Sequence, residues 1–235
     1  DYVISPYPRA SAAVMSSKQR FPVRRIFCVG RNYGAHAREM GFSDKEPPFF
    51  FTKPADALAE TGATIPYPPL TEDLHHEIEL VLAVGKSGAN IAAEDAMMHI
   101  WGAGVGIDFT RRDLQIAHRE KGRPWDWGKA FDHSAPLSPL IPLADIPKAQ
   151  AEFNTGRIWL SVNGELRQDA DLSELIWSVE DIIAFCSQSV RLQAGDLIFT
   201  GTPAGVSAVE PGDSLSGGVD GIGKIQITLG EREAV

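Results

Sequence analysis

The sequence lacks the features that mark several large classes of protein. It contains two cysteines, Cys28 and Cys186, which are too few for a disulfide framework, and both lie in apolar segments that predict buried thiols. No apolar run approaches the roughly 18 residues of a membrane-spanning helix. No charged-then-apolar leader is visible at the N-terminus. These absences predict a cytoplasmic protein.

The sequence also has no cluster of basic residues to offset its acidic composition. Its formal net charge is −9, so nucleic acids and anionic membrane surfaces would be repelled. A P-loop and a Gly-x-Ser-x-Gly elbow are both absent, and Gly102–Gly106 is not followed by the helix start of a dinucleotide-binding motif. We therefore expect no nucleic-acid or membrane partner, and neither a nucleotide enzyme nor a serine hydrolase.

The 235 residues, of which 43% are hydrophobic, are enough for one domain with a sizeable core. Residues 1–22 contain three prolines and little periodicity. They predict an N-terminal arm that packs along the surface or crosses to a partner chain. We expect a single catalytic domain over residues 23–235.

Strand patterns outnumber helix patterns. Alternating or continuous short apolar runs predict strands at 26–29, 49–52, 78–84, 105–109, 158–162, 197–200 and 225–229. Helices are predicted at 93–101, 111–121 and 178–188, the last opening with a Ser-x-x-Asp capping pattern. Asn163-Gly164 predicts a type I′ hairpin, and Pro203 with Gly205 predicts a turn. The pattern favours a mixed, β-rich α+β fold over a doubly wound sheet.

Two glutamates occur two residues apart in the segment His75-His76-Glu77-Ile78-Glu79-Leu80. The spacing places both carboxylates on one face of a strand. Like charges this close repel unless a cation lies between them, and hard cations such as Mg²⁺ select oxygen ligands. A charged edge strand with a solvated face would have the same pattern. The pair alone therefore leaves two interpretations open.

Asp108 follows Gly102–Ile107, a glycine-rich apolar segment that predicts a buried strand. A buried aspartate is costly without a partner or a metal ion. A metal site formed by Glu77, Glu79 and Asp108 explains both patterns. His75 shares the alternating face of the glutamates, so a histidine ligand and a softer metal are an alternative.

His36 and Glu39 are three residues apart and would share one face of a short helix. On that face the carboxylate can orient the imidazole and stabilise its charge, as in a pair that activates water. An ordinary pair on a helix surface has the same spacing.

Two further segments could contact an anion. Lys129 lies among aromatic residues, where its ammonium group needs an anionic partner unless the stem packs and the charged end reaches solvent. The turn at Thr200, Gly201 and Thr202 can present hydroxyls and backbone N–H groups to a carboxylate. A plain turn at the end of a strand is the alternative.

An ordered set of motifs resembles the fumarylacetoacetate hydrolase family, from about Arg24 to Leu229. The set consists of Cys28-Val29-Gly30-Arg31-Asn32-Tyr33 with His36 and Glu39, Phe51-Thr52-Lys53-Pro54, His76-Glu77-Ile78-Glu79, Gly106–Asp113, Lys129-Ala130-Phe131-Asp132 and Thr200-Gly201-Thr202-Pro203. Within the family, the chain looks most similar to the single-domain acylpyruvate hydrolases, in particular the fumarylpyruvate hydrolases of aromatic catabolism.

The resemblance implies a mostly β fold with a mixed β-roll or β-sandwich-like core and a homodimer. It also implies Mg²⁺ or Mn²⁺ on Glu77, Glu79 and Asp108, and a small acylpyruvate as substrate. The family's catalytic pair maps onto His36 and Glu39. A catalytic role for Lys129 and substrate-contacting roles for Gln115 and Thr202 are also implied. The residues themselves add Arg31, Thr200 and Gly201 as candidates for substrate binding.

The resemblance leaves the reaction and the acyl group open. The same metal chemistry can decarboxylate oxaloacetate or isomerise a hydroxydienoate, and a non-enzymatic metal-stabilised binding protein of the same fold is a remote alternative. The predicted His36–Glu39 pair favours hydrolysis, because only hydrolysis needs a base for an attacking water. A carboxylate at the distal end of the substrate has five candidate partners in the sequence: Arg31, Lys53, Arg111, Arg112 and Arg123.

Overall fold

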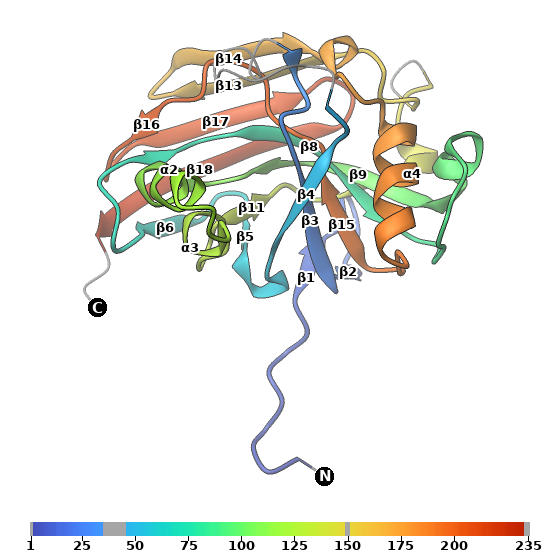
Figure 1. Cartoon of the computed structure of the whole chain (residues 1–235), viewed down its shortest axis with the longest axis horizontal. Helices are drawn as coiled ribbons and strands as arrows, with labels where there is room; N and C mark the ends of the chain where they lie inside the picture. Colours follow the sequence, from blue (N-terminus) through green and yellow to red (C-terminus); the bar gives the residue numbers. More distant parts are fainter. Residues whose placement is uncertain (1, 35–45, 149–150, 233–235) are drawn as a thin grey trace.

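The computed structural model describes residues 2–34, 46–148 and 151–232. Two large sheets form most of the described structure, and the helices lie at their edges (Figure 1). The larger sheet has the order β4-β3-β15-β8-β9-β11-β5, with β12 paired to β9. Its strands are β3 (Arg25–Gly30), β4 (Phe49–Lys53), β5 (Leu58–Glu60), β8 (Ile78–Val84), β9 (Ile100–Ile107), β11 (Ala135–Leu137), β12 (Ile141–Pro142) and β15 (Asp196–Phe199).

The second sheet has the order β14-β13-β17-β18-β6. Its strands are β6 (Thr64–Tyr67), β13 (Arg157–Val162), β14 (Glu165–Asp171), β17 (Ser214–Val219) and β18 (Gly223–Arg232). Both sheets are mixed, because β15 runs parallel to β3 and β18 runs parallel to β6 while most other pairs are antiparallel. Two small sheets pair β10 (Thr110–Arg111), β7 (Leu74–His75) and β16 (Ala208–Val209), and β1 (Ser11–Ala13) with β2 (Arg20–Pro22).

Three α-helices are described: α2 (Arg112–Glu120), α3 (Asp126–Lys129) and α4 (Val179–Ser189). In Figure 1, α4 lies at one side of the sheets, while α2 and α3 lie together at the other. The predicted capping of α4 is confirmed, since Ser178 and Asp181 form a reciprocal capping box. Short 3-10 helices span Ala55–Ala57, Ala93–His99, Leu143–Asp145 and Leu172–Glu174. The helix expected at 93–101 is thus a 3-10 helix that ends at His99, directly before β9.

The prediction of a β-rich mixed fold is confirmed. The hairpin between β13 and β14 turns at Asn163 and Gly164, whose φ angles of 52° and 81° are those of a type I′ turn. Cys28 and Cys186 are both free and buried, as expected. The first strand pair, β1–β2, follows an exposed extended segment that reaches away from the sheets in Figure 1. None of the described helices combines the length and apolar character that a membrane span requires.

Strand β8 is buried along its whole length, which explains its unbroken apolar run. Leu80 and Leu82 contribute to the larger core cluster, which joins the two sheets. Val81 and Ala83 point to the opposite face and belong to a smaller cluster with the β1–β2 hairpin. Glu79 continues this second row, two residues before Val81. The sequence therefore places a carboxylate on a face that is otherwise apolar.

The glycines of β9 permit close packing on that same face. A Cβ atom added to Gly106 would lie 2.5 Å from the ring of Phe199, and one added to Gly102 would lie 2.2 Å from the carbonyl oxygen of Ile141. The Gly-x-Gly-x-Gly pattern is thus explained by packing against neighbouring segments. No nucleotide is needed to account for it.

We expect Gly102→Ala to destabilise the protein by about 1–3 kcal/mol or more, because the new methyl group meets backbone atoms that cannot rotate away. Gly223→Ala is the matched control, since its added Cβ would have no neighbour closer than 3.7 Å. Urea unfolding of both variants measures the difference. Equal midpoints for the two variants would contradict the packing explanation.

Candidate active site

Glu77, Glu79 and Asp108 converge where β8 begins and β9 ends. Glu77 directly precedes β8 and Asp108 directly follows β9, and the Asp108 N–H donates to the Glu77 carbonyl oxygen at 2.8 Å. Ligand oxygens from the three carboxylates lie within 4.8 Å of one another, and all three residues are buried. Antiparallel pairing of the two strands, with Glu79 opposite Gly106, therefore brings together the three acidic residues that the sequence singled out.

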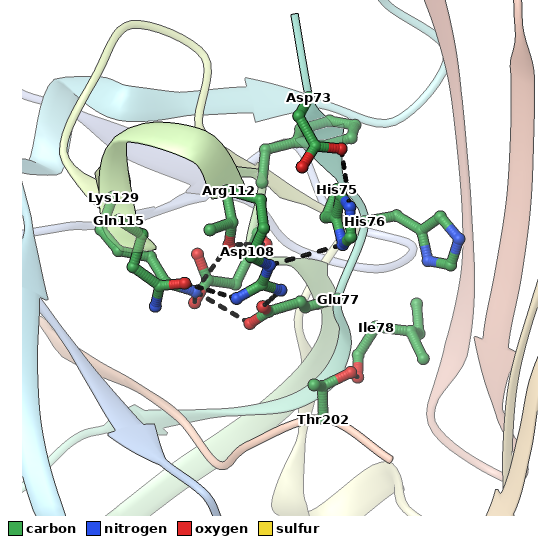
Figure 2. A network of polar contacts seen from close by, with 12 residues as sticks. Asp73, His75, His76, Glu77, Ile78, Asp108, Arg112, Gln115, Lys129 and Thr202 are labelled. Carbon is green, nitrogen blue, oxygen red and sulfur yellow. Dashed lines mark hydrogen bonds and ion pairs between the residues drawn. The ribbon is translucent and has the colours of Figure 1, made fainter. Parts of the chain in front are cut away.

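Two buried lysines contact this cluster. Lys129 Nζ lies 2.8 Å from Glu77 Oε2 and 2.7 Å from Asp108 Oδ2, and it also donates to the Thr110 hydroxyl (Figure 2). Burial disfavours the charged form of Lys129, but Asp108 and Glu77 together raise its pKa above the ordinary value. Lys53 Nζ lies 2.8 Å from Asp108 Oδ1 and donates to the backbone carbonyls of Phe109 and Lys129. Lys129 is therefore a protonated cation beside the carboxylates.

Helix α2 supplies the next contacts. Arg112, in its first turn, donates to Glu77 Oε1 and to the side-chain oxygen of Gln115, three residues further along the same helix face. Because Gln115 uses its oxygen on Arg112, its amide nitrogen is the group it can offer to a substrate. Arg112 thereby fixes both a carboxylate and an amide.

The third carboxylate, Glu79, accepts a hydrogen bond from the Gly201 N–H at 2.8 Å. Burial raises the pKa of Glu79 well above its usual range, and the charges of Asp108 and Glu77 raise it further. A bound cation would reverse this effect by favouring the ionised carboxylates. Gly201 has a φ of 101° and its added Cβ would lie 2.7 Å from Asn32 Cβ, so glycine is required where the backbone approaches Glu79.

The donor set fits a hard divalent metal ion. All three groups are carboxylates, and carboxylate oxygens are ligands that Mg²⁺ and Mn²⁺ prefer. Within the described residues, Asp108 Oδ1 is one of three buried side-chain polar atoms that lack a hydrogen bond of favourable geometry, although Lys53 Nζ is close to it. An oxygen in that situation is suited to metal coordination.

The two neighbouring histidines have other roles. His75 Nε2 lies 2.9 Å from Asp73, and its Nδ1 accepts a weak bond from Arg112, so it stands outside the carboxylate cluster. His76 is fully buried between Gln168 and Ser207, on the far side of the chain from the carboxylates (Figure 2). Burial lowers its pKa to about 4, so His76 is neutral near pH 7. The structure thus gives no support to the alternative of a histidine ligand.

One cavity is lined by two of the three carboxylates and by several of the predicted substrate-binding residues. Its lining includes Glu77, Glu79, Arg31, Gln115, Lys129 and Thr202, together with Phe51, Arg112, Arg119 and Trp125. Arg112 was predicted only as a candidate partner of a distal substrate carboxylate, and Arg119 and Trp125 were not predicted as site residues. The spacing of Arg112, Gln115 and Arg119 at i, i+3 and i+7 is a sequence signal for one helix face that could have revealed Arg119.

The turn after β15 is held mainly by internal hydrogen bonds. Thr200 is fully buried and its hydroxyl donates to the Leu80 carbonyl, while Thr202 donates to the Ile78 carbonyl and accepts from Gln168. Of the three predicted anion-binding residues in this turn, Thr202 lines the cavity, whereas Gly201 binds Glu79. A substrate-binding role of the turn stays a prediction.

The predicted pair His36 and Glu39 lies outside the described residues. The described chain stops at Gly34, four residues after β3 ends, and Arg31 before it lines the cavity. Of the five basic residues considered for a distal carboxylate, Arg112 and Lys53 instead contact Glu77 and Asp108.

Comparison with known proteins assigns a family to the chain. The model of the fumarylacetoacetate (FAA) hydrolase C-terminal family matches residues 25–229. A fumarylpyruvate hydrolase from Ralstonia sp is 46% identical over 188 residues, covering 80% of this chain and 95% of that protein. The mitochondrial oxaloacetate tautomerase of Rattus norvegicus is 40% identical and covers 85% of this chain and 88% of that protein.

Solved structures show the same similarity. The crystal structure of fumarylpyruvate hydrolase from Pseudomonas aeruginosa in complex with Mn²⁺ and pyruvate is 48% identical, has a TM-score of 0.93 and covers 99% of this chain and 100% of that chain. A putative fumarylpyruvate hydrolase from Burkholderia cenocepacia is 55% identical, with a TM-score of 0.92 and the same coverage.

We expect Asp108→Asn and Glu77→Gln to weaken Mg²⁺ binding by at least about 10- to 100-fold, because each change removes an anionic ligand while keeping the side-chain shape. Calorimetric titration of the purified variants with Mg²⁺ measures this directly, without any turnover. Asp132→Asn, which alters an exposed aspartate outside the cluster, should bind as tightly as the unaltered protein. Unchanged affinity in both cluster variants would exclude these residues as ligands.

Proposed function

This chain belongs to the fumarylacetoacetate hydrolase family, and on that premise we propose that it is a metal-dependent hydrolase that cleaves a carbon–carbon bond of an acylpyruvate, with fumarylpyruvate as its substrate. The observation that carries the proposal is the buried cluster of three carboxylates in contact with Lys129, next to a cavity that is lined by Glu77, Glu79, Lys129, Gln115 and arginines. The similarity to fumarylpyruvate hydrolases, one of them solved with Mn²⁺ and pyruvate, supports it.

The metal ligands proposed are Glu77, Glu79 and Asp108, with Mg²⁺ or Mn²⁺ as the ion. When bound, the ion supplies Lewis-acid charge that stabilises negative charge developing on the keto-acid end of the substrate. Arg112 holds Glu77 in position, and the Gly201 N–H holds Glu79. The Mg²⁺ or Mn²⁺ identity, a homodimer and a cytoplasmic location stay predictions from the sequence.

Lys129 and Gln115 would contact the reacting part of the substrate. The Lys129 ammonium lies at the cavity wall and adds positive charge next to the carbon–carbon bond that breaks. The Gln115 amide would donate a hydrogen bond to a substrate oxygen. Both side chains are held in place by hydrogen bonds to the carboxylate cluster or to Arg112. They would therefore be positioned before the substrate arrives.

His36, oriented by Glu39, is proposed to accept a proton from the attacking water. The water oxygen bonds to the acyl carbonyl carbon, and the bond from that carbon to the methylene group of the pyruvate portion breaks. The methylene carbon takes up a proton, so the products are a carboxylic acid and pyruvate. For fumarylpyruvate they are fumarate and pyruvate.

Chemistry on oxaloacetate is the second candidate function. Relatives named oxaloacetate tautomerase and oxaloacetate decarboxylase are 36–40% identical to this chain. Each of these reactions also develops negative charge on a 2-keto acid, which the same carboxylate-bound ion and Lys129 would stabilise. They differ from hydrolysis in needing no activated water.

Side-by-side kinetics on fumarylpyruvate, acetylpyruvate and oxaloacetate, with and without added Mg²⁺ or Mn²⁺, test the proposed function. We expect metal-dependent hydrolysis of an acylpyruvate with a kcat/KM above that of any reaction on oxaloacetate. Turnover of oxaloacetate alone would favour the second candidate. No metal-dependent turnover of any of these substrates would refute the proposal.

His36→Ala should lower acylpyruvate hydrolysis by about 10²–10⁴-fold, the usual contribution of a general base. Mg²⁺ affinity should stay unchanged, because other residues are the proposed ligands. Decarboxylation of oxaloacetate should fall much less, since no water is deprotonated in that reaction. Hydrolysis at the unaltered rate in this variant would leave His36 without a catalytic role.

A further inference from the structure

One face of helix α2 forms a row of donors along the cavity. Arg112, Gln115 and Arg119 are spaced at i, i+3 and i+7, and all three line the cavity that contains Glu77 and Glu79. Arg112 is at the carboxylate end, where it contacts Glu77. Seven residues of helix correspond to a rise of about 10 Å. Arg119 is therefore about two turns along the helix from the proposed metal ligands.

Arg31 reaches the same cavity from the end of β3. It is a non-glycine residue with a φ of 62°, a conformation that is uncommon outside turns and is often found at functional sites. Its guanidinium carbon lies 5.1 Å from the centre of the Phe49 ring, and 22% of its side chain is exposed. Burial lowers the pKa of Arg31 and the nearby charge of Arg119 lowers it further, whereas Glu46 acts in the opposite direction. The two positive charges therefore oppose each other in the cavity that both residues line.

Aromatic side chains form the wall near these two arginines. Phe51 and Trp125 line the same cavity, with ring centres 5.9 Å apart, and Phe49 packs edge-on against Trp125 at 5.4 Å. Flat apolar walls of this kind suit a planar unsaturated chain. The cavity therefore combines acidic groups for a metal, an aromatic wall and a pair of guanidinium groups.

We propose that Arg31 and Arg119 bind a second carboxylate at the distal end of the substrate, so that the enzyme selects acylpyruvates whose acyl group ends in a carboxylate over those that end in a methyl group. The proposal rests on the acylpyruvate hydrolase function proposed above. Guanidinium groups bind carboxylates through strong charge-assisted hydrogen bonds, often in pairs. A carboxylate between Arg31 and Arg119 would also relieve their mutual repulsion.

The other basic candidates are placed less favourably. Lys53 and Arg112 contact Asp108 and Glu77. Arg111 is buried with its guanidinium 4.3 Å from the centre of the Phe131 ring, and Arg123 lines a separate surface hollow with His118 and Trp127. Neither Arg111 nor Arg123 contributes to the lining of the carboxylate cavity.

A structural role for Arg31 is the competing explanation, since its Nη1 lies 3.7 Å from Glu46 Oε2. The Glu46 side chain is 71% exposed, and exposed ion pairs of this length contribute little to stability. A substrate carboxylate can therefore compete with Glu46 for this arginine. The two explanations differ in substrate dependence, because loss of a structural pair affects all substrates alike.

Kinetics with two substrates test the proposal. Arg119→Met keeps the length of the side chain and removes its charge. We expect the ratio of kcat/KM for fumarylpyruvate to kcat/KM for acetylpyruvate to fall about 10- to 100-fold, the size expected for a lost charge-assisted hydrogen bond. The change should lie mainly in KM, and fumarate should become a weaker competitive inhibitor. Arg31→Met should shift the ratio in the same direction.

The double variant strengthens the test. If both arginines bind one carboxylate, their combined effect on the ratio should differ from the product of the single effects. Arg123→Met, an exposed arginine just beyond α2, is the matched control and should leave the ratio unchanged. Should Arg119→Met prove unstable by thermal unfolding, Arg119→Lys keeps the charge and should reduce the ratio by a smaller factor.

The outcomes separate this proposal from the proposed function. An unchanged ratio in Arg119→Met, or an equal loss of kcat/KM with both substrates, would overturn the proposal that Arg31 and Arg119 bind the distal carboxylate. The proposed hydrolase function would be unaffected by that result. If the unaltered protein with metal hydrolyses neither substrate, the proposed function itself is wrong, and the proposed binding of a distal carboxylate is then wrong as well.

Discussion

The burial of three carboxylates in one place is the constraint on which the site depends. Glu77, Glu79 and Asp108 would repel one another strongly in a medium of low dielectric. The surrounding chain compensates with cations and donors from separate segments: Lys129, Lys53, Arg112 and the Gly201 N–H. The cluster therefore ties β4, β8, β9, α2, α3 and the turn after β15 to one point. The same negative charge is what a divalent ion requires.

The sheet determines where this point can form. Glu79, Val81 and Ala83 lie on the same face of β8, and the pairing with β9 brings Asp108 to the backbone of Glu77. Glycine residues in β9 allow other segments to approach that face closely. The part of this face formed by Val81 and Ala83 is apolar and contributes to the core, whereas the end with Glu79 is polar and belongs to the candidate site. Strand β8 therefore contributes both to the core and to the candidate site, because side chains two residues apart lie on the same face of a strand.

Local patterns were enough to predict much of this arrangement. The period of two identified Glu77 and Glu79 as neighbours, the cost of a buried charge drew attention to Asp108, and Asn163-Gly164 fixed a hairpin. The contact of Lys53 with Asp108 and the place of Arg119 in the cavity were not predicted, because both depend on contacts between distant segments. Strand β17 was also missed, since Gly217 and Gly218 are poor strand formers that are needed where Trp159 and Ile78 pack closely. Tertiary packing overrides local propensity at such positions.

The cavity divides into parts with different chemical demands. Its inner part holds carboxylates and Lys129, whose positions are coupled by buried ion pairs, so a change at one of these residues disturbs the others. Arg31 and Arg119 are only partly buried and lie on the ends of a strand and a helix, where substitution disturbs less of the core. Stabilisation of charge on a 2-keto acid is common to hydrolysis, tautomerisation and decarboxylation, so it constrains the inner part in all of these reactions. Selection of the group attached to the keto acid depends on the outer part, which is free to differ while the fold and the metal chemistry stay the same.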